Sequence, residues 1–249
     1  MKNTYEEFKK DIVFIGGPCA VEDEQTLYDI AVAVKKHGAT ALRAGAFKPR
    51  TSPYDFQGLG EDGLKILASV GKKVGIKTVS EITDVRLLSK YADIDILQVG
   101  ARNMQNFALL KELGKTDKPV IIKRGFVNTA EELLLSAEYV LSGGNERVAI
   151  CERGIRTFEN STRFTLDLCS VAALKLKSEL AIIVDPSHAA GDCKIVKSLA
   201  LAAVAAGADG IMTEVHTHPE NALCDGAQAI SPEVFGEIVK AGKAIKKII

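Results

Sequence analysis

The 249-residue sequence lacks an excess of charge of either sign and a long apolar run. Its 32 basic residues balance 32 acidic residues, so it has no overall positive field of the kind that favours nucleic acid or a membrane surface. No stretch approaches the roughly 18 consecutive apolar residues of a membrane-spanning helix. The N-terminus carries acids where a signal peptide needs apolar residues. We therefore expect a cytoplasmic protein without nucleic-acid or membrane partners, in which any anion site is a local cluster of basic residues.

The five cysteines form no recognisable motif. They are odd in number and show no CxxC spacing, so neither a disulfide framework nor a zinc ribbon is predicted. We expect most of them to be reduced and buried, and Cys151, Cys169 and Cys193 to be structural. Cys224 adjoins Asp225, so its role stays open.

The chain also lacks a Pro/Gly/Ser-rich linker, and no GxGxxG turn follows its first apolar run. Short β-branched runs alternate with amphipathic stretches from one end to the other, which is typical of parallel βα units. The eight runs are residues 12–17, 40–45, 76–81, 96–101, 119–124, 147–153, 180–188 and 210–216. This pattern predicts a closed (β/α)8 TIM barrel as a single domain over residues 1–249, with an N-terminal arm at 1–11 and no regulatory domain. A doubly wound open sheet is the alternative, which the missing GxGxxG turn disfavours.

Polar residues gather at one end of the predicted strands. In a closed barrel the C-terminal strand ends form one mouth, where the chemistry of such barrels lies. The turns at the opposite end consist mostly of small or uncharged residues. Structural ion pairs would be expected at both ends, so this asymmetry indicates a functional site. The basic residues predicted at the mouth are Arg43, Lys48, Arg50, Arg102, Lys123 and Arg153. Glu81 and Glu214 are too few to neutralise them, so we expect bound phosphate or carboxylate groups, which suit the planar fork of arginine.

Four potential metal ligands follow neighbouring strands of the predicted barrel: Cys19, His188, Glu214 and Asp225. A thiolate, an imidazole and two carboxylates suit Zn, Mn, Fe or Co rather than Mg or Ca. Spacing alone leaves open a structural interpretation, with a small buried cysteine and a histidine bonded to a carbonyl.

The string VHTHP offers two further histidines, His216 and His218. Pro219 ends the strand after them, so alternation does not direct both side chains to one site. We expect them beside the ligands rather than among them.

Seven motifs in order resemble one enzyme family. They are GGPCAVE (16–22), RAGAFKPRTSPY (43–54), SEITD (80–84), QVGARNMQN (98–106), IIKRG (121–125), DPSHAAG (185–191) and EVHTHPENALCDGAQAI (214–230). Together they resemble 3-deoxy-D-arabino-heptulosonate 7-phosphate (DAHP) synthase, in its smaller microbial subfamily related to 3-deoxy-D-manno-octulosonate 8-phosphate synthase. The resemblance covers nearly the whole chain from about Ile12.

The resemblance implies a metal-dependent transferase of the shikimate pathway, which leads to chorismate and the aromatic amino acids. This family joins carbon 3 of phosphoenolpyruvate to the aldehyde carbon of D-erythrose 4-phosphate, adds water at carbon 2 and expels phosphate. It implies one divalent ion (Mn, Zn, Fe or Co) on Cys19, His188, Glu214 and Asp225. By the same resemblance, phosphoenolpyruvate contacts fall on Arg43, Lys48, Arg102, Lys123 and Arg153, with Glu81 nearby in the substrate site, and erythrose 4-phosphate contacts on Arg50 and Thr51.

Cys19 and His188, as ligands, and Lys48 or Lys123 are the expected catalytic residues. A lysine among other cations has a lowered pKa, so either lysine is a candidate proton shuttle. Family barrels usually assemble as oligomers, so a homo-oligomer, dimer or tetramer, is expected. Many relatives carry a regulatory domain before the barrel, and feedback control within this chain is not expected.

Two other functions stay open. One is octulosonate synthesis from arabinose 5-phosphate, whose enzymes typically show an Asn-Arg pattern where this chain has Pro49-Arg50-Thr51. The other is a non-catalytic barrel that binds phosphorylated metabolites, which would have no use for Cys19 and His188 together.

Overall fold

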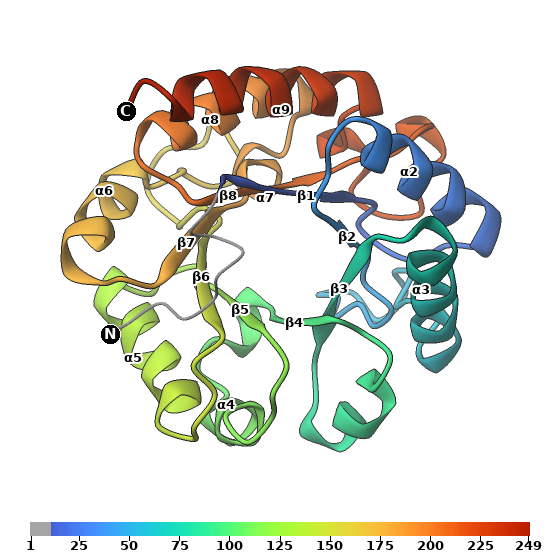
Figure 1. The fold of residues 1–249 in the computed structure, drawn as a ribbon, viewed down its shortest axis with the longest axis horizontal. Helices are drawn as coiled ribbons and strands as arrows, with labels where there is room; N and C mark the ends of the chain where they lie inside the picture. Colours follow the sequence, from blue (N-terminus) through green and yellow to red (C-terminus); the bar gives the residue numbers. More distant parts are fainter. Residues whose placement is uncertain (1–10) are drawn as a thin grey trace.

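The computed structural model describes residues 11–249, so all but the last residue of the predicted N-terminal arm lies outside the described residues. Eight parallel strands follow one another in chain order around a closed barrel, and β8 pairs with β1 (Figure 1). The strands are β1 (Val13–Gly17), β2 (Ala41–Arg43), β3 (Lys77–Ile82), β4 (Ile96–Val99), β5 (Val120–Lys123), β6 (Val148–Glu152), β7 (Ala181–Val184) and β8 (Gly210–Glu214). The predicted closed barrel is confirmed, and the open sheet is wrong.

Helices form the outer ring of the barrel (Figure 1). They are α2 (Glu24–Lys36), α3 (Glu61–Val74), α4 (Phe107–Leu113), α5 (Ala130–Leu141), α6 (Leu168–Lys177), α8 (Cys193–Ala205) and α9 (Pro232–Lys246). A further short helix, α7 (Pro186–Ala190), follows β7 directly and lies inside this ring. Short 3-10 helices are η1 (Val85–Tyr91), η2 (Ala101–Asn103), η3 (Pro219–Asn221) and η4 (Gly226–Gln228). The third βα unit thus has a 3-10 helix where the other long connections have an α-helix. Within residues 11–249, no helix is both long and apolar enough to cross a bilayer.

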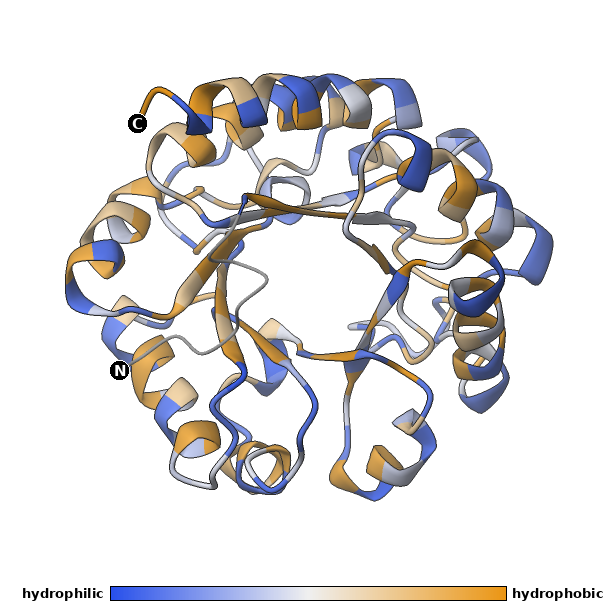
Figure 2. Cartoon of the chain, in the orientation of Figure 1, coloured by the Kyte–Doolittle hydropathy of each residue, from blue (hydrophilic) through white to orange (hydrophobic). Residues whose placement is uncertain are grey.

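Alternation along the strands divides the core into two layers. Side chains such as Phe14 and Leu42 point outward and pack beneath the helices, whereas Ile15, Val79 and Cys151 point into the barrel. Figure 2 shows hydrophobic colours along the strands and hydrophobic and hydrophilic bands on the helices, as this arrangement requires. The interior is therefore packed, and a site is available only beyond the strand ends.

Three of the five cysteines are buried, as expected for most of them. Cys19, Cys151 and Cys224 are buried, Cys193 is half-buried and Cys169 is exposed. Cys169 faces solvent because it lies near the start of α6 rather than on the face that packs against the barrel.

The seventh strand is shorter than its predicted range of 180–188, which is a correction. It ends at Val184 because Asp185 caps a helix and Pro186 occupies the first helical turn of α7. The Asp185 carboxylate accepts a hydrogen bond from the backbone N–H of His188 at 3.0 Å. This turn holds the His188 side chain at the mouth on a helix rather than on a strand.

A buried ion network ties the end of β5 to β6 and α6. Neighbouring strand residues point to opposite faces, so Lys123 lines the mouth while Arg124 turns outward. Arg124 Nη1 lies 2.8 Å from Glu152 Oε2 and 2.9 Å from Asp167 Oδ2, and its Nε donates to the Asn128 carbonyl at 2.8 Å. Asp167 is also the N-cap of α6. The network fixes the loops that frame the mouth.

Arg124→Ala is expected to destabilise the fold by about 3–5 kcal/mol, because it leaves Glu152 buried without its cation. The measurement is the urea-unfolding midpoint followed by circular dichroism. Arg86→Ala is the matched control, since Arg86 forms an exposed pair with Asp84 and its loss should change the midpoint little. Equal midpoints for the two variants would contradict this structural role of Arg124.

Candidate active site

A cavity of about 410 Å³ opens at the C-terminal ends of the strands. Eight basic side chains line it: Arg43, Lys48, Arg50, Arg102, Lys123, Arg153, Arg156 and Arg163. Three acidic side chains line it as well: Asp55, Glu81 and Asp225. This local excess of positive charge, in a chain of zero formal net charge, suits an anionic ligand. All six basic residues predicted at the mouth lie there, together with Thr51.

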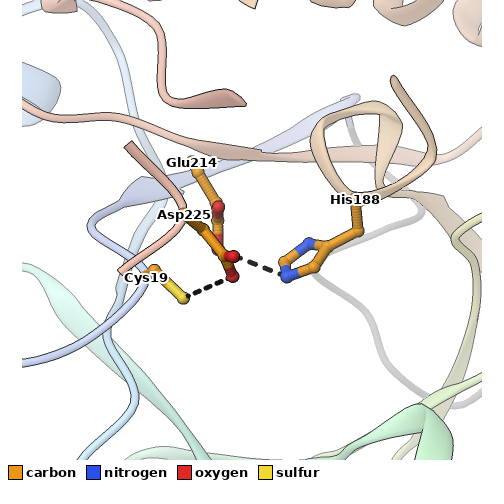
Figure 3. Close-up of side chains that lie close together, drawn as sticks. All are labelled: Cys19, His188, Glu214 and Asp225. Carbon is orange, nitrogen blue, oxygen red and sulfur yellow. Dashed lines mark hydrogen bonds and ion pairs between the residues drawn. The ribbon is translucent and has the colours of Figure 1, made fainter. Parts of the chain in front are cut away.

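The four predicted metal ligands converge beside this cavity (Figure 3). One donor atom of each residue lies within 4.8 Å of the other three. His188 Nε2 is 3.3 Å from Glu214 Oε1, and Cys19 Sγ is 3.2 Å from Asp225 Oδ2. Cys19 follows β1, Glu214 ends β8, and Asp225 lies between η3 and η4. The donor set fits a divalent ion of the Zn, Mn, Fe or Co type, and metal binding stays a prediction.

Asp225 has an unusual backbone conformation. With φ of 55°, it is the only non-glycine residue among 11–249 with positive φ. Such a left-handed conformation is disfavoured for residues that carry a Cβ, and it persists where the surrounding structure enforces it. At Asp225 it turns the carboxylate toward Cys19.

Asp185 orients the imidazole of His188. The Nδ1 atom of His188 lies 2.7 Å from Asp185 Oδ2, which leaves Nε2 directed at Glu214. Burial lowers the pKa of His188 to about 4, against the opposing effect of Asp185 and Glu214. The ring is therefore neutral near pH 7, which is the protonation state that a metal requires.

Glu214 is held from several sides. Arg43 Nη1 lies 2.5 Å from Oε1, and the Gln228 side chain donates to Oε2 at 2.6 Å. Burial would raise the pKa of Glu214, but the charges of His188 and Arg43 hold it at about 2. At neutral pH, where His188 is uncharged, Arg43 and Lys48 remain as the stabilising charges.

Gln228 and Arg163 were not predicted from the sequence. Gln228 is buried and accepts a hydrogen bond from Arg163 Nη1 at 2.9 Å, and the same nitrogen lies 3.6 Å from Asp225 Oδ1. Together they connect the two carboxylate ligands to the loop after β6. A lone glutamine gives no signal in a sequence, and Arg163 reaches the cavity only because the 155–165 segment folds back on itself.

Lys48 contacts the predicted thiol ligand, with its Nζ 2.9 Å from Cys19 Sγ and 3.1 Å from the Cys19 carbonyl. Burial and Arg43 lower the pKa of Lys48, but Cys19, Glu81 and Glu214 together raise it, so the pKa lies above its usual value. The expected lowering is therefore wrong for Lys48, because the acidic groups around it outweigh burial and the one neighbouring cation, Arg43. A hydrogen bond with Cys224 and burial raise the pKa of the Cys19 thiol.

The remaining predicted residues lie at the cavity or behind it. Lys123 pairs with Asp185, and Gln98 donates to Glu81 at 3.4 Å. His216 Nε2 lies 3.6 Å from Glu22 Oε2, whereas His218 is largely exposed. Among residues 11–249, neither histidine belongs to the group of four ligand atoms. Their place beside the ligands stays a prediction.

Comparison with known proteins identifies the family. A model of the DAHP synthetase I family matches residues 8–249. The chain belongs to this family. Phospho-2-dehydro-3-deoxyheptonate aldolase of Thermotoga maritima is 50% identical over 232 residues, which cover 93% of this chain and 69% of that protein. A 2-dehydro-3-deoxyphosphooctonate aldolase of Geobacter sulfurreducens is 30% identical and covers 96% of this chain and 94% of its own length.

Solved structures of a DAHP synthase are also similar to this chain. The crystal structure of the Thermotoga maritima DAHP synthase matches with a TM-score of 0.89 and 49% identity, over 95% of this chain and 69% of that one. A truncated form of the enzyme matches with a TM-score of 0.86 and 45% identity, over 95% of this chain and 86% of that one. The family resemblance predicted from the seven motifs is confirmed.

Cys19→Ala is expected to weaken the binding of a divalent metal by at least about 100-fold, because it removes one of four donors. The fold should remain, since alanine replaces a small buried side chain. Titration of the purified protein with Mn²⁺ or Zn²⁺, with circular dichroism as the check of folding, measures both. The control is Cys169→Ala, at an exposed cysteine. Unchanged metal affinity in Cys19→Ala would show that Cys19 only fills space.

Proposed function

We propose that this chain condenses phosphoenolpyruvate with D-erythrose 4-phosphate and water to give DAHP and phosphate, the first step of the shikimate pathway. The observation that carries the proposal is a cluster of four metal-type donors beside a cavity lined by eight basic side chains. Membership of the DAHP synthetase I family and 50% identity to the Thermotoga maritima protein support it. Assembly as a homo-oligomer, dimer or tetramer, belongs to the same proposal and is checked by light scattering.

Cys19, His188, Glu214 and Asp225 would hold the divalent ion. A neutral imidazole and an ionised glutamate are already present at neutral pH, which favours the fit. The bound ion would supply Lewis acidity for the aldehyde oxygen or for a water molecule. Which of Mn, Zn, Fe or Co it is depends on the site's geometry and on metal supply as well as on these ligands.

The basic side chains would bind the two phosphate groups and the carboxylate of the substrates. Arginine forks bind such oxygens bidentately, and converging cations stabilise the negative charge that develops during condensation. The residues assigned to phosphoenolpyruvate are Arg43, Lys48, Arg102, Lys123 and Arg153, with Glu81 nearby, and all of them line the cavity. Two of these cations are already paired inside the protein, Arg43 with Glu214 and Lys123 with Asp185.

Arg50 and Thr51 would bind the phosphate of the aldose. Both lie in the segment between β2 and α3 and line the cavity. Arg50 has only a long contact with Asp55, 3.4 Å from Nε to Oδ2, and that carboxylate is itself exposed. The guanidinium is therefore available to a ligand.

Lys48 is the better placed of the two candidate lysines to donate a proton. Its raised pKa keeps it protonated at neutral pH, so it would donate to the aldehyde oxygen as negative charge develops there, rather than accept a proton. Lys123 is held by Asp185, the carboxylate that also orients His188. Its charge would help to bind phosphoenolpyruvate.

The test is a phosphate-release assay with phosphoenolpyruvate and either erythrose 4-phosphate or arabinose 5-phosphate, before and after chelation. Turnover that depends on erythrose 4-phosphate and is lost with chelator supports the proposal. Preference for arabinose 5-phosphate would instead identify an octulosonate synthase, as in the relatives at about 30% identity. No turnover with either aldose would leave a binding protein.

Arg50→Ala is expected to raise the KM for the aldose phosphate by about 10-fold or more, the loss of one charge-assisted contact, while the KM for phosphoenolpyruvate changes little. Steady-state kinetics with each substrate varied in turn measures the two constants. Lys175→Ala is the control, because Lys175 pairs with Asp209 just before β8, at the opposite end of the barrel. Equal increases in both KM values would refute the assignment of Arg50.

A further inference from the structure

Three arginines of the cavity carry no acidic partner. The five other basic residues contact a carboxylate or the Cys19 sulfur: Arg43, Lys48, Arg50, Lys123 and Arg163. Within residues 11–249, Arg102, Arg153 and Arg156 form no ion pair. Arg153 is only 4% exposed, and its Nη1 has no hydrogen-bond partner. Because a buried N–H group without a partner is costly, Arg153 is expected to be completed by a ligand.

The same three arginines stand over one aromatic ring. Their guanidinium carbons lie 5.5 Å (Arg102), 4.9 Å (Arg153) and 5.7 Å (Arg156) from the centroid of Phe126. Arg153 also lies 4.6 Å from the centroid of Phe164, which stacks on Phe126 at 5.2 Å with an angle of 11° between the rings. The four distances between a guanidinium carbon and a ring centroid lie within the range of cation–π contacts.

Backbone hydrogen bonds fix both rings at the cavity. The Phe126 carbonyl accepts from the Arg156 N–H at 2.7 Å, which joins the loop after β5 to the loop after β6. The Phe164 N–H donates to the Ala189 carbonyl at 2.9 Å, on the same short helix α7 as His188. The two rings line the cavity and are anchored to the elements that hold the predicted ligands.

We propose that Phe126, supported by Phe164, is a positioning residue that directs Arg102, Arg153 and Arg156 toward the phosphate of phosphoenolpyruvate. The identity of the substrate rests on the proposed function. An aromatic face attracts a guanidinium through its quadrupole yet carries no net charge. A carboxylate in its place would neutralise the arginines and compete with the phosphate. The ring therefore offsets the repulsion among three cations and leaves their charge available for a dianion.

Phe126→Leu keeps most of the apolar volume and removes the aromatic face, whereas Phe126→Tyr keeps the face. Calorimetric titration with inorganic phosphate at fixed ionic strength should show affinity lowered on the order of 10-fold in Phe126→Leu and nearly unchanged in Phe126→Tyr. The KM for phosphoenolpyruvate should rise by a similar factor. The kcat and the KM for erythrose 4-phosphate should change by less than about twofold, because a positioning effect on one phosphate is a binding effect.

Two further variants make the test specific. Phe107→Leu is the control, since Phe107 stacks on Tyr139 at 4.5 Å outside the cavity and should leave phosphate binding unchanged. Arg156→Ala should weaken phosphate binding by itself, and its effect should be smaller in the Phe126→Leu background, because both changes remove the same contact. The Arg156 side chain is exposed, so this variant remains informative if Phe126→Leu does not fold.

Equal behaviour of the leucine and tyrosine variants, additive effects with Arg156→Ala, or unchanged phosphate affinity in Phe126→Leu would each overturn the inference. A wild-type protein without turnover that loses phosphate binding in Phe126→Leu alone would refute the proposed function and keep the role of Phe126. If the wild-type protein turns over normally and Phe126→Leu has the same phosphate affinity, the proposed function is kept and the role of Phe126 is refuted.

Discussion

The buried contact between Arg43 and Glu214 connects the closure of the barrel to the site. Glu214 ends β8 and Arg43 ends β2, so the pair spans β1, the strand between them. Gly17 ends β1 at this point, and a Cβ there would lie 2.1 Å from the Arg43 carbonyl oxygen. Once Glu214 is held, its other contacts follow: His188 lies at 3.3 Å and Gln228 donates to its second oxygen. The contact that spans β1 thus also sets the position of a predicted ligand.

Two kinds of interaction stabilise the many cations of the cavity. Carboxylates pair with Arg43 and Lys123, and burial strengthens these pairs. The positive charge of both side chains is then largely neutralised within the protein. Aromatic faces hold Arg153 without neutralising it. The paired cations define the shape of the cavity, and the unpaired ones define what it attracts. Arg153 belongs to the unpaired cations, and its buried Nη1 has no hydrogen-bond partner.

The barrel was predictable from the sequence because its strands are buried on both faces. Such strands appear as short β-branched runs, so each of the eight was found within a few residues of its bounds. Seven of them end where predicted to within about two residues, but β7 does not, since the Asp185-Pro186 pair starts a helix whose cap outweighs the apolar run before it. The third unit forms a 3-10 helix, η1, which periodicity alone does not distinguish from an α-helix.

The part of the site that strand ends determine was predictable from the fold pattern, whereas Arg50 and Thr51, in a loop, were assigned through the family resemblance. Cys19, His188 and Glu214 follow strands directly, so the closed barrel brings them together whatever the loops do. Gln228, Arg163 and Phe126 act through loop conformation, and nothing in their spacing indicates a contact with a strand-end residue. The raised pKa of Lys48 was missed for a related reason. Counting cations at the mouth predicts a lowered pKa, but Cys19, whose sulfur lies 2.9 Å from Lys48 Nζ, Glu81 and Glu214 raise it.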